Sequence, residues 1–403
     1  MELNLFQLKP FQISLSCIPI STLPDQYQIL IRDLVPITGF VFVFLSVFLH
    51  LDNPKTPVWD GLKAVDWIGT ATVVGGTLML LLGLEFGGVT HPWASATVIC
   101  LIVFGIVTIG LFAFNEWKYA KYPITPMRLF SKRSNVAAIA VCFFHGLVFM
   151  SASYYLPLYF QAVLGAPPLL SGVYLLPWAL SFSITSYVTG IVIKKTGKYL
   201  PLLYFGVIVM TLGFGLYIDL PPSRSFAKIF LYQIVAGIGA GPIFNSPLVA
   251  LQAMVEPRDI ATATSTFFFA RVLSAAVSVV IGNVVFQNEM VKRRPSLAAS
   301  IGQATADRLT GGSAAANVRI LKDLPPTQQH EARMAYWHSL RTMWIMYVAL
   351  MGVTLVASLF MVHQKLSTQH VATKTGLKAE EEHRKKDIEQ KKKAGVGNDV
   401  EKA

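Results

Sequence analysis

The amino-acid sequence predicts an all-α polytopic membrane protein. Of its 403 residues, 53% are hydrophobic and 14% are charged, whereas charged residues make up nearer a quarter of soluble domains. The charges are also segregated, because long apolar runs alternate with short basic stretches. A transmembrane helix needs about 20 mainly apolar residues, and runs of that length are too long for the strands of a membrane β-barrel.

Nine segments are long and apolar enough to cross the bilayer. In chain order they are 34–51, 66–86, 93–114, 136–160, 168–193, 200–219, 226–251, 260–286 and 340–362. Backbone groups in lipid must find their hydrogen-bond partners within the span, so each of these segments is expected to be a helix. The sequence therefore predicts about nine transmembrane helices.

The connecting loops predict how these helices are oriented. Loops 52–65, 115–135 and 194–199 are rich in Lys and Arg, whereas loops 87–92 and 161–167 contain neither residue. Basic loops stay on the cytoplasmic side, so this alternation places the C-terminus in the cytoplasm and the N-terminus outside. The same distribution accounts for the net charge of +12 without a nucleic-acid partner.

Three stretches lie outside the predicted spans. Residues 1–33 form an N-terminal leader, and residues 287–339 form a long external loop with an amphipathic region over 328–343. Residues 364–403 are rich in Lys, Glu and Gln, which is typical of a disordered or loosely helical cytoplasmic tail. The three cysteines and the histidines show no disulfide framework and no zinc-ligand spacing, so neither a metal nor a cofactor is expected.

Two ionisable residues lie within apolar spans. Arg271 follows the run Phe267–Ala270, and a charge near the bilayer centre costs about 2.5 kcal/mol or more. It is expected to face the bundle interior or an aqueous cavity, with a partner group or an anionic substrate beside it. The alternative is a structural arginine that snorkels or braces a neighbouring helix. His145 could relay a proton or contact substrate. Its alternative is a histidine hydrogen-bonded to a neighbouring helix.

Span 226–251 contains a cluster of small and helix-weakening residues: Gly237, Gly239, Gly241, Pro242, Asn245 and Pro247. Small residues let neighbouring membrane helices approach closely. Prolines release backbone carbonyls, which are tolerated only beside protein or a water-filled cavity. Both a functional bend facing something polar and simple close packing are therefore open, and Asn245 is a candidate cavity residue.

Two further sites lie near helix ends. Gln161 follows an aromatic run at the outer end of its span, where an interface belt and a substrate contact are both open interpretations. The stretch from Gly190 to Lys198 forms a tight cytoplasmic loop in which Gly197 permits the turn. Its lysines, Lys194 and Lys198 among them, could pair with helix C-termini or with acidic partners.

Several of these motifs together resemble one family of transporters. The residues that carry the resemblance are the runs Tyr154–Gly165, Ser171–Pro177, Gly190–Lys198, Gly237–Gly241 with Pro247, and Ala261–Thr266 with Arg271. They are similar to the fungal major facilitator superfamily, in its 14-span drug:proton antiporter branch of toxin efflux pumps. The similarity covers about Phe40 to His363.

The resemblance implies a domain organisation. Residues 34–51 correspond to the last span of the N-terminal half, 66–114 to two central linker spans, and 136–362 to a complete C-terminal six-helix bundle. Five further spans that precede these in the family have no counterpart here. The resemblance therefore implies either an N-terminally truncated chain or one that pairs with another copy or with a missing N-terminal half.

The resemblance also implies a function. It predicts proton-coupled efflux of small lipophilic compounds through the plasma membrane or a vacuolar membrane. His145, Gln161, Asn245 and Arg271 would line the cavity on the C-terminal bundle. The alternative is a non-transporting fragment in the lipid bilayer that binds or regulates a partner transporter. A membrane enzyme is not expected, because the spans contain no His–Asp or Asp–Asp pair.

Overall fold

The computed structural model describes residues 25–48, 58–88, 90–120, 124–125, 127–256, 259–310 and 316–364. The chain forms two compact units, Met1–Thr56 and Pro57–Ala403. Almost all of the predicted tail and residues 1–24 of the predicted leader lie outside the described ranges.

The first unit contains helix α1 (Asp25–Phe48). Its apolar part, Val35–Phe48, corresponds to most of the span predicted over 34–51. The helix begins at Asp25, well inside the predicted leader. The ten residues before Val35 include Asp25, Arg32 and Asp33. They do not extend the apolar run, so hydropathy places the start of the helix too late.

The second unit begins with a helical hairpin. It consists of the short α2 (Val58–Ala64), α3 (Trp67–Phe86) and α4 (Ala96–Lys118). Asp66 caps α3, its Oδ1 accepting from Gly69 N at 2.7 Å, and Ser95 caps α4. The two helices touch at glycines: a Cβ atom on Gly76 would lie 3.2 Å from the Gly105 carbonyl oxygen. Small residues thus allow the close contact that holds membrane helices together.

The remaining long helices form a bundle. They are α5 (Arg133–Ala162), α6 (Pro168–Tyr174), which leads into α7 (Leu176–Thr196), α8 (Leu200–Tyr217), α9 (Phe226–Met254), α10 (Ile260–Lys292) and α13 (Pro326–Leu359). Helix α5 packs against α9, α10 and α13, and α9 packs against α7 and α8. More than half of the apolar window of α5 and of α9 is buried, against less than a fifth for α4 and for α6–α7. Helices α5 and α9 therefore form the centre, and α4 and α7 present their apolar faces outward.

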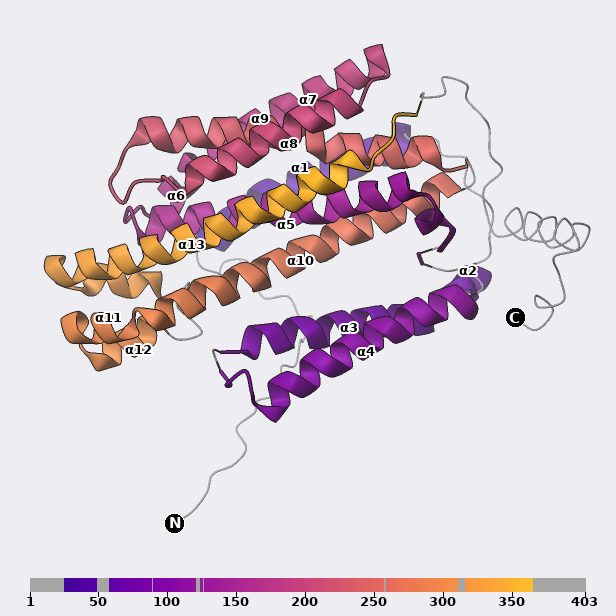
Figure 1. Cartoon of the computed structure of the whole chain (residues 1–403). Helices are drawn as coiled ribbons and strands as arrows, with labels where there is room; N and C mark the ends of the chain where they lie inside the picture. The colour runs from indigo at the N-terminus through magenta and orange to yellow at the C-terminus, as the bar shows by residue number, and fades with distance from the viewer. Residues whose placement is uncertain are drawn as a thin grey trace, which may run out of the picture. The chain divides into compact units, whose positions relative to one another are not determined.

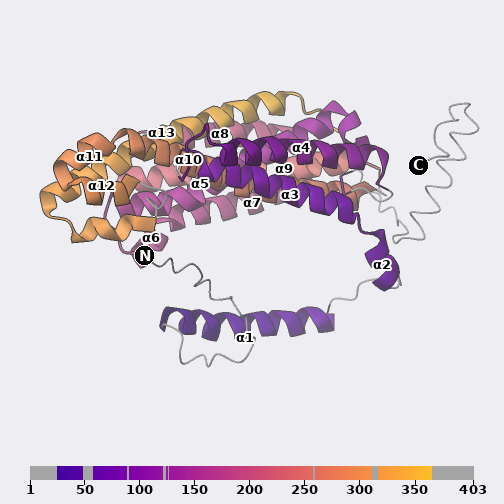
Figure 2. The same cartoon turned by 90° about the horizontal axis from the view of Figure 1, so that it is seen from below.

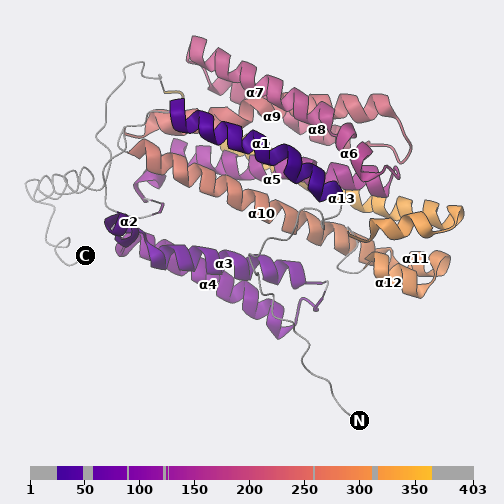
Figure 3. The same ribbon diagram turned by 180° about the vertical axis from the view of Figure 1, so that it is seen from behind.

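The α3–α4 hairpin attaches to the bundle through α3, which runs beside α10 (Figures 1 and 3). A hydrogen bond joins the two helices, with Asn283 Nδ2 donating to Glu85 Oε1 at 2.7 Å. A carboxylate at a helix end in the membrane needs such a partner, because leaving it unpaired is costly. The side chain of Glu85 thus ties the hairpin to α10.

The segment between α10 and α13 is mostly helical. It contains α11 (Arg294–Ile301), α12 (Gln303–Thr310) and the 3₁₀ helix η4 (Ala316–Asp323), and α11 and α12 lie at one end of the bundle beside α10 and α13 (Figure 2). The sequence places a loop over 287–339. Its helices are polar and short, so the apolar-length criterion does not detect them.

The predicted fold class is confirmed. In the described part of the chain, eight helices are long and apolar enough to cross a membrane, and Val35–Phe48 is a shorter apolar helix. The predicted amphipathic region over 328–343 is part of α13, which begins at Pro326 and continues into the apolar span.

Candidate substrate-contact site around Arg271

Helix α10 places Arg271 beside α9. The Nη2 atom of Arg271 donates to the carbonyl oxygen of Phe244 at 2.8 Å. The guanidinium carbon lies 3.9 Å from the centroid of the Phe244 ring and 4.9 Å from that of Phe267. A guanidinium over an aromatic face gains about 2 kcal/mol when desolvated. The arginine therefore braces α9, as its structural interpretation predicts.

This contact leaves part of the arginine unsatisfied. Its Nε atom is buried and has no hydrogen-bond partner, and no carboxylate of the described residues forms an ion pair with it. The aromatic rings and one carbonyl oxygen stabilise the positive charge without neutralising it. An anionic or electron-rich group of a ligand would find an open partner here, so the role in substrate contact stays a prediction.

His145 lies next to this arginine on the neighbouring helix α5. The side chain is 1% exposed, it is close enough to Arg271 for electrostatic interaction, and its ring centroid is 6.5 Å from that of Phe244. Neither ring nitrogen has a hydrogen-bond partner. The interpretation of His145 as hydrogen-bonded to a neighbouring helix is therefore wrong. The rings of Phe149 and Phe244 lie beside the imidazole and offer no hydrogen-bond acceptor in the plane of its nitrogens.

Four aromatic side chains complete the surroundings of Arg271 and His145. Phe149 on α5 lies 5.5 Å from Trp178, 4.9 Å from Phe182 and 5.8 Å from Phe244, measured between ring centroids. Sequence reasoning did not select these residues. A signal was present, since His145 and Phe149, like Trp178 and Phe182, are four residues apart and share a helix face. We call these four rings the aromatic cluster.

The other two predicted cavity residues make contacts that do not involve Arg271 or His145. Asn245 Nδ2 donates to Ser186 Oγ at 2.8 Å, which links α9 to α7. Gln161 Nε2 is 3.5 Å from Ser171 Oγ, near the end of α5. It is 16 residues from His145, which is about 24 Å along a helix. The structure thus brings Arg271 and His145 together and leaves Gln161 elsewhere.

The alternate glycines of α9 allow close contact with α7 on one side and with α8 on the other. A Cβ atom on Gly237 or Gly241 would collide with α7, 3.0 Å from Phe182 N and 2.6 Å from Ser186 N respectively. A Cβ atom on Gly239 would instead collide with α8, 2.6 Å from Met210 Cα. The close-packing interpretation of this run therefore holds. Pro242 and Pro247 lie within the helix, and a functional bend there stays a prediction.

The predicted tight loop lies at the end of α7. Gly197 has a φ of 68°, and it ends α7 by donating its N–H to the carbonyl oxygen of Ile193. Lys194 and Lys198 are exposed near this turn, and Gly190 faces open space. No ion pair of these lysines is present among the described residues, so the suggested acidic partners stay a prediction.

The fold and this site define a polytopic membrane protein with a cationic, aromatic-lined patch among its helices. Comparison with known families narrows this class. The family model described as Major Facilitator Superfamily matches residues 35–279. The chain belongs to the major facilitator superfamily, a family of transporters rather than enzymes.

Individual relatives support the same assignment. The chain is 48% identical over 346 residues to the efflux pump dotC of Dothistroma septosporum (strain NZE10 / CBS 128990), covering 86% of this chain and 59% of dotC. It is 46% identical over 358 residues to the MFS-type transporter ppz2 of Metarhizium majus, covering 89% and 62%. The resemblance to fungal efflux transporters is thereby confirmed, and the chain spans about three fifths of the length of these relatives.

A solved structure also aligns with the chain. It is a bacterial homologue of the human lysosomal transporter Spinster, in an inward-facing and occupied conformation. The alignment has a TM-score of 0.47 at 14% sequence identity and covers 77% of this chain and 66% of that chain.

Proposed function

We propose that this chain is part of a secondary transporter that expels small lipophilic compounds, with proton entry as the driving force. Two similar proteins are named as an efflux pump and a transporter, which supports this class of activity. The observation that carries the proposal is the Arg271 guanidinium, which lies on aromatic rings with its Nε unpartnered. Such a site binds flat, electron-rich compounds through stacking and cation–π contacts.

Each group then has a proposed role. The aromatic cluster supplies apolar surface, and Arg271 orients the ligand by its charge. His145 is an imidazole close to Arg271, so it is the candidate for carrying the coupled proton. In this proposal 136–362 forms one wall of the path, 66–114 the two linker spans, and 34–51 the last span of the other wall. A second copy or an N-terminal half supplies the rest, and the plasma membrane is the proposed location.

The test is flux through reconstituted protein. The purified chain is placed in proteoliposomes, and movement of a fluorescent lipophilic compound is followed under an imposed pH difference. Loss of a contact worth about 2 kcal/mol should slow transport about 30-fold in Arg271→Gln. The matched control is Arg294→Gln. Arg294 forms an ion pair with Asp307 at 2.6 Å, and this pair is far from the aromatic cluster.

Two results would contradict the proposal. Equal flux in Arg271→Gln and wild type would remove Arg271 from the path. Gradient-dependent movement by dotC in the same preparation, with none by this chain, would instead favour the alternative of a fragment that binds a partner transporter. Adding the part of dotC that this chain does not cover, as a separate chain, then tests whether pairing restores flux.

A further inference from the structure

Two arginines from distant parts of the sequence converge where α5 ends. Arg224, between α8 and α9, donates from Nη2 to the carbonyl oxygen of Leu164 at 3.2 Å. Arg333, on α13, lies against the next residue, because a Cβ atom on Gly165 would be 2.6 Å from Arg333 Nη2 and 3.1 Å from its Cζ. The two guanidinium groups are close enough to repel each other electrostatically. Together they form what we call the arginine pair.

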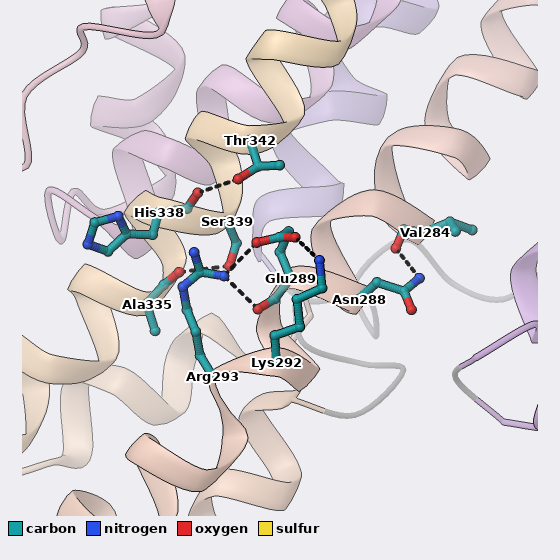
Figure 4. A network of polar contacts seen from close by, with 9 residues as sticks. All are labelled: Val284, Asn288, Glu289, Lys292, Arg293, Ala335, His338, Ser339 and Thr342. Atoms are coloured by element: carbon teal, nitrogen blue, oxygen red, sulfur yellow. Dashed lines mark hydrogen bonds and ion pairs between the residues drawn. The ribbon is translucent and has the colours of Figure 1, made fainter.

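Nearby cations in the same region have carboxylate partners. Glu289 binds both Lys292 and Arg293, at 2.6 and 2.8 Å (Figure 4), and Arg294 binds Asp307 at 2.6 Å. The arginine pair differs, because no Asp or Glu in the described ranges forms an ion pair with either member. The Nε atom of Arg333 is in addition buried without a hydrogen-bond partner.

The local backbone does not neutralise these two charges. The C-terminal end of α5 carries about half a negative charge from the helix dipole, against two full positive charges. Gly165 has a φ of 69°, so the chain turns there and leaves room for the guanidinium of Arg333. Guanidinium groups present paired N–H donors that match the oxygens of a phosphate. The arginine pair therefore has the charge and the donors to hold one phosphate group.

The surroundings are those of a membrane–water interface. Trp337 Nε1 donates to the carbonyl oxygen of Leu220 at 2.7 Å, and the Tyr159 hydroxyl donates to that of Pro221 at 2.5 Å. Such amphipathic aromatic residues concentrate at headgroup depth. Exposed apolar side chains lie close in sequence to these contacts: Leu169, four residues after Gly165, is 85% exposed, and Phe226, two residues after Arg224, is 42% exposed. A ligand with a phosphate and acyl chains fits both kinds of surface.

We propose that Arg224 and Arg333 form a phosphate-binding site at the membrane interface, occupied by the headgroup phosphate of a phospholipid. The short loops 87–92, 161–167 and 220–225 contain no Lys or Arg apart from Arg224. Short loops decide orientation, and the alternation of basic loops places these three outside, so the lipid belongs to the outer leaflet. The site is separate from the Arg271 site and does not depend on transport.

The experiment measures binding to the purified full chain in neutral detergent. Native mass spectrometry and thermal unfolding are followed during titration with dioctanoyl phosphatidic acid, with dioctanoylglycerol, and with inorganic phosphate. Phosphatidic acid should bind and raise the Tm, whereas dioctanoylglycerol, which has the same chains without phosphate, should not. Inorganic phosphate that competes with the lipid would support the phosphate site, and the ratio of the two affinities identifies its natural source.

Variants of the arginine pair provide the decisive comparison. Arg224→Gln and Arg333→Gln should each weaken phosphatidic acid binding at least tenfold, and Arg294→Gln should bind as wild type does. Arg333→Lys keeps the charge and loses the paired donors, so a weakened affinity is expected in a folded protein. Unchanged binding in Arg333→Lys and in both glutamine variants, or equal binding of dioctanoylglycerol, would overturn the proposal.

Discussion

The packing of α9 on α8 leads to a prediction about stability: alanine should destabilise the chain at Gly239 and stabilise it at Gly190. At Gly239, an added Cβ atom would lie 2.6 Å from Met210 Cα and 2.8 Å from the Gly206 carbonyl oxygen. Ordinary contacts of a Cβ atom are 3.4 to 4 Å. The obstructing atoms belong to the α8 backbone, so a change of rotamer cannot relieve the overlap. At Gly190, by contrast, no atom lies within 4 Å.

The expected magnitudes follow from two opposing effects. Alanine in place of a helical glycine stabilises by about 0.5–1 kcal/mol. Overpacking costs about 1–3 kcal/mol, and the upper end applies at Gly239 because backbone atoms must separate. We therefore expect Gly239→Ala to destabilise the chain by about 2 kcal/mol, and Gly190→Ala to stabilise it by up to about 1 kcal/mol.

The assay is unfolding in mixed micelles by increasing fractions of sodium dodecyl sulfate, followed by circular dichroism and tryptophan fluorescence. Wild type, Gly239→Ala and Gly190→Ala are compared in the same detergent. If both variants were stabilised equally, the interhelix contact at Gly239 would not limit the approach of α8 and α9, and the reasoning would be refuted.

Three further predictions concern other parts of the second unit. Asn283→Leu should lower the stability of the attachment of α3 to α10 by about 1–3 kcal/mol, because the Glu85 carboxylate loses its donor. Hydrogen exchange should become faster than in wild type in α3 but not in α8; unchanged exchange in α3 would contradict the prediction. Gly197→Ala should cost about 1–2 kcal/mol in the same micelle assay, because φ is positive there, whereas an unaltered midpoint would refute the strain argument. Lys228 and Tyr232 hold the pKa of the Asp219 carboxyl below 3.8, so its charge stabilises the fold above that pH and this contribution is lost as the pH falls further. Asp219→Asn should therefore be less stable than wild type at pH 7 and equal to it near pH 2; a difference that persists in acid would show another cause.

Much of the fold was predictable because the bilayer restricts the choices. Runs such as 200–219 and 226–251 must be helical once they lie in lipid, and the structure has helices at Leu200–Tyr217 and Phe226–Met254. The bilayer imposes no such restriction outside the hydrocarbon. The polar helices α11 and α12 and the start of α13 at Pro326 were missed for that reason.

The candidate site was predictable only in part. Arg271 stands out in the sequence because a charge within an apolar run is costly. Its partner is a backbone carbonyl of α9, and no pattern along the chain identifies such an atom. The error for His145 has the same origin, since its neighbours are Phe149 and Phe244. Rings from different helices gather only through tertiary packing.

The length of α10 has a consequence for observing this protein at work. The helix has 33 residues, so it is about 50 Å long, whereas the hydrocarbon core is about 30 Å thick. It therefore extends beyond the hydrocarbon core, with Arg271 in its apolar part and Arg293 directly after its last residue. A tilt too small to detect beside the arginine would be magnified at that tip. A spectroscopic probe attached there, in water and away from the ligand, would report events occurring deep among the helices.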